Sequence, residues 1–130
     1  MKKSYASAIW FSIMSLVGCS SNPTNANLDL SQINSKDAAK ALVSEGKLAK
    51  VYMFPLELGG IDAEINVLYV THKAAAEKEK IDAEILALAQ EGKIKKYECN
   101  PNYLTKSFVP NSLQIIAVGD RQYSYSVQVF

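Results

Sequence analysis

ALVSEGKLAK, residues 41–50, and ALAQEGKIKK, residues 87–96, are two copies of one pattern that lie 46 positions apart in the chain. In each copy an Ala/Leu run ends at Glu-Gly-Lys, and a glycine in the left-handed conformation just past the last turn is a common helix stop. A β-favouring run follows directly, and Pro55 after the first copy matches Pro101 after the second. Each half of the chain is therefore predicted to be a helix followed by a strand. Internal duplication and convergence on the same stop chemistry both explain the repeat.

The two predicted helices are each apolar on one side. The first runs from about Ser35, a suitable N-cap, to Glu45, and the second from about His72 or Lys73 to Glu91. The apolar side of the first helix consists of Ala38, Ala39, Leu42 and Val43. That of the second consists of Ala74, Ile81, Ile85, Leu88 and Ala89, whereas its water-facing residues are expected to be Glu77, Lys78, Glu79, Lys80 and Glu84.

Five strands are predicted from β-rich runs, at residues 48–54, 65–70, 94–99, 113–118 and 122–129. Gly119 and Asp120 are predicted to form a two-residue turn between the last two strands. In the last strand the aromatic and aliphatic residues alternate with polar ones, so one face of that strand is expected to be solvated. The order α-β-β-α-β-β-β predicts an α+β two-layer sandwich, with two helices on one face of a mainly antiparallel five-stranded sheet.

Composition indicates an ordinary globular domain without a strong charge bias. The chain has 14 Lys and Arg residues against 13 Asp and Glu residues, and without Lys2 and Lys3 the balance is 12 against 13. The basic residues are interspersed with acidic ones and do not form a stripe, so no nucleic-acid partner is expected.

The first 18 residues have the layout of a secretory signal peptide. Lys2 and Lys3 precede an uncharged, largely apolar run from Tyr5 to Gly18, which is too short to cross a bilayer core that takes about 20 helical residues. The end of this run, Leu16-Val17-Gly18-Cys19, resembles the lipobox of bacterial lipoprotein precursors. The resemblance implies cleavage before Cys19 and lipidation of that cysteine, which would anchor the chain in a membrane. An uncleaved signal anchor, or a conventional signal with an accidental cysteine, is the alternative.

Ser20 occupies the position at which an acidic residue would, by analogy with that family, imply retention in the inner membrane. We therefore expect the periplasmic leaflet of the outer membrane. Residues 19–27 are polar with one proline and are predicted to be a flexible tether, and residues 28–130 a single globular domain. Cys99 is then the only cysteine left to the folded part, so no intramolecular disulfide is expected.

A search for catalytic or metal-binding patterns returns little. His72, the only histidine, has no neighbouring ligands at zinc spacing and suits a solvated or capping role. Cys99 follows two lysines that would lower the pKa of an exposed thiol, although a lone strand cysteine is more often buried. The pentapeptide IDAEI occurs at 61–65 and 81–85, but its carboxylates are expected to be solvated charges rather than an acid–base pair. We predict no metal site, no cofactor and no catalytic residue.

The most distinctive segment is the predicted loop 100–111, which is bracketed by prolines and contains large apolar residues. Aromatic residues on a scaffolded loop often form recognition surfaces, so Tyr103 and Phe108 are the candidate binding residues. The alternative is that Leu104 and Phe108 fill a satellite core under the sheet. The sequence thus favours a non-enzymatic envelope lipoprotein that binds a protein partner as an accessory subunit. A periplasmic inhibitor or immunity protein against a lytic enzyme, and an enzyme whose site is assembled from distant positions, are the alternatives.

Overall fold

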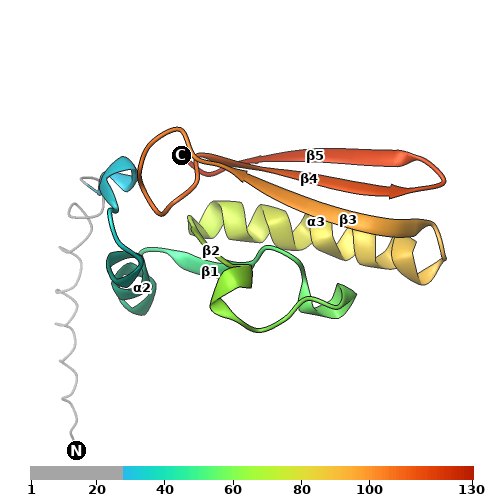
Figure 1. The fold of residues 1–130 in the computed structure, drawn as a ribbon, viewed down its shortest axis with the longest axis horizontal. Coiled ribbons are helices and arrows are strands. Elements are labelled where there is room, and N and C mark those ends of the chain that lie inside the picture. Colours follow the sequence, from blue (N-terminus) through green and yellow to red (C-terminus); the bar gives the residue numbers. More distant parts are fainter. Residues whose placement is uncertain (1–27) are drawn as a thin grey trace, which may run out of the picture.

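The structure, a computed structural model, describes residues 28–130. The predicted signal peptide (1–18), Cys19 and the tether (19–27) lie outside the described residues. The described part is an α+β fold with two α-helices, five strands and short 3-10 turns (Figure 1). In chain order its elements are η4 (Leu30–Gln32), α2 (Lys36–Ser44), β1 (Ala49–Tyr52), η5 (Leu56–Leu58), η6 (Glu64–Asn66), β2 (Val67–Val70), α3 (His72–Gln90), β3 (Ile94–Asn102), β4 (Ser112–Gly119) and β5 (Gln122–Gln128).

The five strands form two separate antiparallel sheets. β1 pairs with β2 in one sheet, and the other has the order β3-β4-β5. Helix α3 contacts β1 on one side and β3 and β5 on the other, and it lies between the two sheets in Figure 1. Helix α2 contacts β2.

The prediction of one five-stranded sheet with both helices on one face is therefore wrong. β1 is only four residues long and ends before Pro55, which has no N–H for a ladder. The backbone N–H and C=O of Phe54 are both bound by the side chain of Asn66, so the strand cannot continue through this residue. With β1 this short and α3 packed between, β1 and the β3-β4-β5 sheet do not join.

Both helices begin and end as the sequence predicts. Ser35 caps α2 and Thr71 caps α3, each side-chain oxygen accepting a hydrogen bond from the N–H three residues on. At the other end, Gly46 and Gly92 have the same φ of 78°. The next N–H in each copy of the repeat donates to the corresponding carbonyl, Lys47 to Leu42 at 2.8 Å and Lys93 to Leu88 at 2.9 Å. The repeated sequence thus has one repeated local structure.

The β4–β5 hairpin is confirmed, but its turn lies one position later than predicted. Val118 pairs with Gln122, and the N–H of Gly119 donates to the carbonyl of Arg121. A Cβ on Gly119 would overlap the carbonyl oxygen of Lys93, so this glycine is required by the close approach of β3 to β4. β5 alternates as expected, with Ser124, Ser126 and Gln128 exposed.

The core lies between α3 and the sheets. Its fully buried members include Leu48, Val70, Ile85, Leu113, Ile115, Val109 and Val127. Lys78, which was expected to face water, is 2% exposed and belongs to the buried side of α3 with Ala74, Ile81 and Ile85. Its position follows from helical spacing, since it lies four residues after Ala74 and three before Ile81.

Candidate functional site

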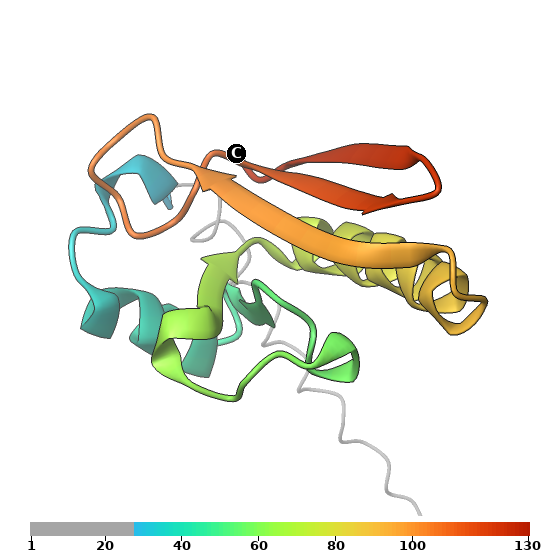
Figure 2. The ribbon, with the colours of Figure 1, turned by 45° about the vertical axis from the view of Figure 1, so that its right-hand side comes forward.

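The loop between β3 and β4, residues 103–111, is tied to the rest of the domain by backbone and side-chain hydrogen bonds. The N–H of Phe108 donates to the carbonyl of Ile33 at 2.8 Å, and the hydroxyl of Ser107 donates to the carbonyl of Leu30 at 2.5 Å. The side chain of Asn111 accepts from the N–H of Leu104 at 2.8 Å. Figure 2 shows the loop curving over η4, which belongs to the first described residues. These bonds fix the path of the loop.

The same loop displays its large apolar side chains to solvent. Tyr103 is 45% exposed, Leu104 72% and Phe108 41%. Leu104 and Phe108 therefore do not fill a satellite core. Val109 of this loop is completely buried and belongs to the main core, and its neighbours Ser107 and Pro110 are also buried. Partial burial raises the pKa of the Tyr103 hydroxyl above its usual value. The structure thus places Tyr103, Leu104 and Phe108, here called the loop patch, on one short ordered segment.

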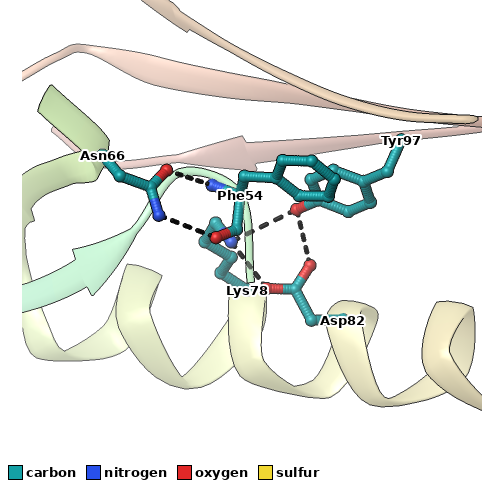
Figure 3. A network of polar contacts seen from close by, with 5 residues as sticks. All are labelled: Phe54, Asn66, Lys78, Asp82 and Tyr97. Carbon is teal, nitrogen blue, oxygen red and sulfur yellow. Dashed lines mark hydrogen bonds and ion pairs between the residues drawn. The ribbon is translucent and has the colours of Figure 1, made fainter. Parts of the chain in front are cut away.

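A second feature, which the sequence interpretation missed, is a buried polar cluster between α3 and β3 (Figure 3). The ammonium of Lys78 lies 2.6 Å from Oδ2 of Asp82 and donates to the hydroxyl of Tyr97 at 3.2 Å. Tyr97 in turn donates to Oδ1 of Asp82 at 2.7 Å. The side chain of Lys78 is 3% exposed and that of Asp82 18%. The pKa of Tyr97 lies well above its usual range. Burial is the larger cause of this shift, and the hydrogen bond to Asp82 is the second.

Phe54 covers this cluster. Its ring is stacked on that of Tyr97 with 5.4 Å between centroids and 3° between planes. Asn66 holds the backbone of Phe54 in place by accepting from its N–H and donating to its C=O, and it also donates to the carbonyl of Ile61. Asp82, Lys78 and Tyr97 therefore satisfy one another's hydrogen-bonding groups, and these bonds stabilise the contact of α3 with β3.

The comparisons with known proteins find no relative: no family model, curated protein or solved structure matches this chain.

Cys99 lies near the cluster and is 8% exposed. Desolvation raises the pKa of its thiol from 9.0 to about 11, with Lys78 opposing and Asp82 reinforcing this shift. The preceding lysines, Lys95 and Lys96, are exposed and are not among the groups that lower it. The interpretation of Cys99 as a small buried residue fits this environment, and the reactive-thiol interpretation does not.

The carboxylates of the two IDAEI copies are not arranged as acid–base pairs. Asp62 accepts from the hydroxyl of Tyr52 at 2.8 Å, and Glu64 lies 3.3 Å from the ammonium of Lys40. The bond with Lys40 holds the pKa of Glu64 below its usual range. In the second copy Glu84 is exposed, but Asp82 is not the solvated charge that was expected, because it pairs with Lys78.

His72 begins α3, and its Nε2 lies 2.9 Å from the carbonyl of Gly46, past the end of α2. It thus has the capping role expected from the sequence. Within residues 28–130, no group of three or more His, Cys, Asp or Glu residues is placed to hold a metal ion. In the same range, neither helix is long and apolar enough to cross a bilayer.

A groove of about 590 Å³ lies between α3 and the segment 50–58. One wall is a stripe of α3 residues with helical spacing, among them Ala75, Ala76, Ala83 and Leu86. The other wall includes Val51 of β1 and Leu58 of η5. Lys78 and Asp82 also line the groove, so the polar cluster borders it.

Proposed function

We propose that this protein is a lipid-anchored, non-enzymatic binding subunit of the bacterial cell envelope, which uses the loop patch to contact a protein partner. The lipobox-like sequence ending at Cys19 supports the anchor, and Ser20 supports the outer membrane, facing the periplasm. The polar residues 20–27 would serve as the tether between the lipid and the domain.

The observation that carries the binding role is the combination of exposure and order in the loop patch. Tyr103, Leu104 and Phe108 expose large apolar surface on a segment whose backbone is bound to Ile33 and Asn111. A preordered loop loses little conformational entropy on association, and Tyr is enriched at the energetic centres of protein interfaces. A protein surface with an apolar recess is the partner that suits these side chains.

The test of the binding role is photo-crosslinking from position 103 in intact cells, followed by mass spectrometry. A photoreactive residue at position 87 is the matched control, because Ala87 is exposed on α3 and does not line the groove. We expect one envelope protein to be captured from position 103 and not from position 87. A lytic enzyme as the captured protein would make the chain an inhibitor, whereas no specific protein adduct would refute the proposal.

The anchor has a separate test. Cells labelled with palmitate should incorporate the label into the wild-type chain and not into Cys19→Ala. If the wild-type chain is unlabelled and Cys19→Ala still fractionates with membranes, the lipoprotein proposal is wrong.

A further inference from the structure

The groove between α3 and the segment 50–58 runs along one edge of β1. Lys50, Val51 and Tyr52, three consecutive residues of β1, line it, whereas no residue of β2 does. Side chains of consecutive strand residues point to opposite faces, so a hollow that all three residues border follows the strand's edge. Because β2 occupies one edge of β1, the groove lies along the other.

The hydrogen-bond phase of the β1-β2 ladder shows which backbone groups face that edge. The N–H of Met53 donates to the carbonyl of Asn66 at 2.8 Å, one step beyond the paired residues Tyr52 and Val67. In an antiparallel ladder every second residue bonds to the partner strand, so Val51 and Ala49 share the orientation of Met53. Lys50 and Tyr52 therefore direct their N–H and C=O groups away from β2.

Within residues 28–130, the backbone N–H and C=O groups of Lys50 and Tyr52 have no hydrogen-bond partner across this edge, and the one side-chain bond of Tyr52 is made by its hydroxyl to Asp62. The edge is short, because at Phe54 the side chain of Asn66 already takes both backbone groups. Two residues thus offer an N–H and a C=O each, at the spacing that an added strand uses.

The α3 wall of the groove suits the side chains of such a strand. Ala75, Ala76 and Ala83 are small, which leaves room above the helix, and Leu86 and Leu58 add apolar contact. Charges of both signs border the groove, Lys50 on β1 and Glu79 on α3 among them, so the walls do not select a strongly charged ligand. Alternate side chains of an added strand would face the helix wall and the others would face away.

We propose that the groove binds an extended peptide segment of a partner polypeptide, which adds as a strand to the free edge of β1 and places apolar side chains against the alanine face of α3. The added strand pairs with the four residues Ala49–Tyr52. This groove is distinct from the loop patch, because no residue of the loop 103–111 lines it. The proposal requires neither the lipid anchor nor the loop patch to function.

The first test is amide hydrogen exchange of the full chain in detergent micelles, measured without a ligand. The amides of Lys50 and Tyr52 should exchange at least tenfold faster than that of Val51, which is bonded to β2. Slow exchange of Lys50 and Tyr52 in the monomer would overturn the proposal. Slow exchange that appears only at high protein concentration would also overturn it, by making a second copy of the chain the occupant.

The second test uses a phage-displayed library of random dodecapeptides as the probe, selected against the same protein. Selected peptides should protect the amides of Lys50 and Tyr52, and Ala76→Arg and Ala83→Arg should weaken their binding at least tenfold by filling the groove. Ala87→Arg, an exposed change on the same helix outside the groove, is the matched control and should leave binding unchanged.

Two further experiments test the strand pairing and separate this inference from the proposed function. N-methylation of successive peptide amides should abolish binding at every second position only, as strand pairing requires. Tyr103→Ser should not change peptide binding, and Ala83→Arg should not change crosslinking from position 103. Failure to select any peptide, or selected peptides that bind equally well to Ala83→Arg, would refute the groove as a peptide site.

Discussion

The hydroxyl of Tyr97 donates a 2.7 Å hydrogen bond to the carboxylate of Asp82 and so joins β3 to α3 through a group that also pairs with Lys78. Three polar side chains that are each partnered within a mostly buried cluster are costly to separate, because removing one leaves the others desolvated without compensation.

Asp82→Ala is expected to lower the free energy of unfolding by about 3 kcal/mol, because it leaves the Lys78 ammonium buried and unpaired. Urea denaturation measures the change, with Glu84→Ala, at an exposed position of the same helix, as the control. The triple variant Lys78→Met/Asp82→Leu/Tyr97→Phe removes all three polar groups and should recover most of the loss. A loss no larger than that of Glu84→Ala would show that the pair does not contribute to stability.

The stability of the fold should fall at alkaline pH in a way that depends on Cys99. The pKa of its thiol is raised from 9.0 to about 11 in the folded state, so the unfolded chain loses this proton first as pH rises. The contribution of the protonated thiol to the free energy of unfolding is therefore complete below pH 9 and is lost between pH 9 and about 11. A shift of two pKa units corresponds to about 3 kcal/mol.

The measurement for this prediction is the difference in unfolding free energy between wild type and Cys99→Ala across that interval. Tyrosine ionisation affects both proteins and largely cancels in the difference. The difference in unfolding free energy between the two proteins should narrow above pH 9. If the two free energies instead fall in parallel with pH, the raised pKa of Cys99 is contradicted.

Gly119→Ala is expected to destabilise the fold by about 2 kcal/mol or more, since the added Cβ overlaps the backbone carbonyl of Lys93 and β3 must move away from β4. Gly46→Ala is the comparison, because a Cβ there has nothing within 4 Å and only the positive φ of 78° opposes it, at a cost of about 1 kcal/mol. Thermal unfolding of both variants should show the larger loss of stability for Gly119→Ala. Equal effects would mean that crowding at Gly119 is relieved without cost.

Ser107→Ala should loosen the loop that displays the loop patch. The buried hydroxyl of Ser107 donates to the carbonyl of Leu30 and accepts from the N–H of Val109 at 3.0 Å, so its removal leaves both groups without a partner at a cost of about 2 kcal/mol. Hydrogen exchange of the Val109 amide should accelerate markedly. Ser126→Ala, on the solvated side of β5, should change neither stability nor exchange.

The sequence predicts those parts of the fold whose causes are local. The ends of α2 and α3 depend on Gly46 and Gly92, and the exposed side of β5 depends on strict alternation, so each is visible within a few residues. Tyr103 and Phe108, the candidate binding residues, are both exposed, and their role in binding stays a prediction.

The features that the sequence did not predict depend on contacts between distant segments. Whether β1 joins a larger sheet depends on where α3 packs and on the bonds from Asn66 to Phe54, twelve residues apart. The burial of Lys78 is visible in the helical spacing, yet its partner Tyr97 lies on another element, and charge alone had favoured a solvated position. Periodicity contains no information about such pairings.

The bonds from Ser107 to Leu30 and from Phe108 to Ile33 also determine when the domain can fold during synthesis. A ribosome or a translocation channel releases the chain from its N-terminus, so residues 30–33 emerge long before the residues that bind them, 77 positions later in the case of Leu30 and Ser107. Until then this segment lacks its partners, and α3 lacks the β3-β4-β5 sheet that covers it. The domain therefore reaches its native state only after residues 107 and 108 have emerged, and a chain truncated before residue 107 should be a substrate for proteolysis rather than a smaller folded protein.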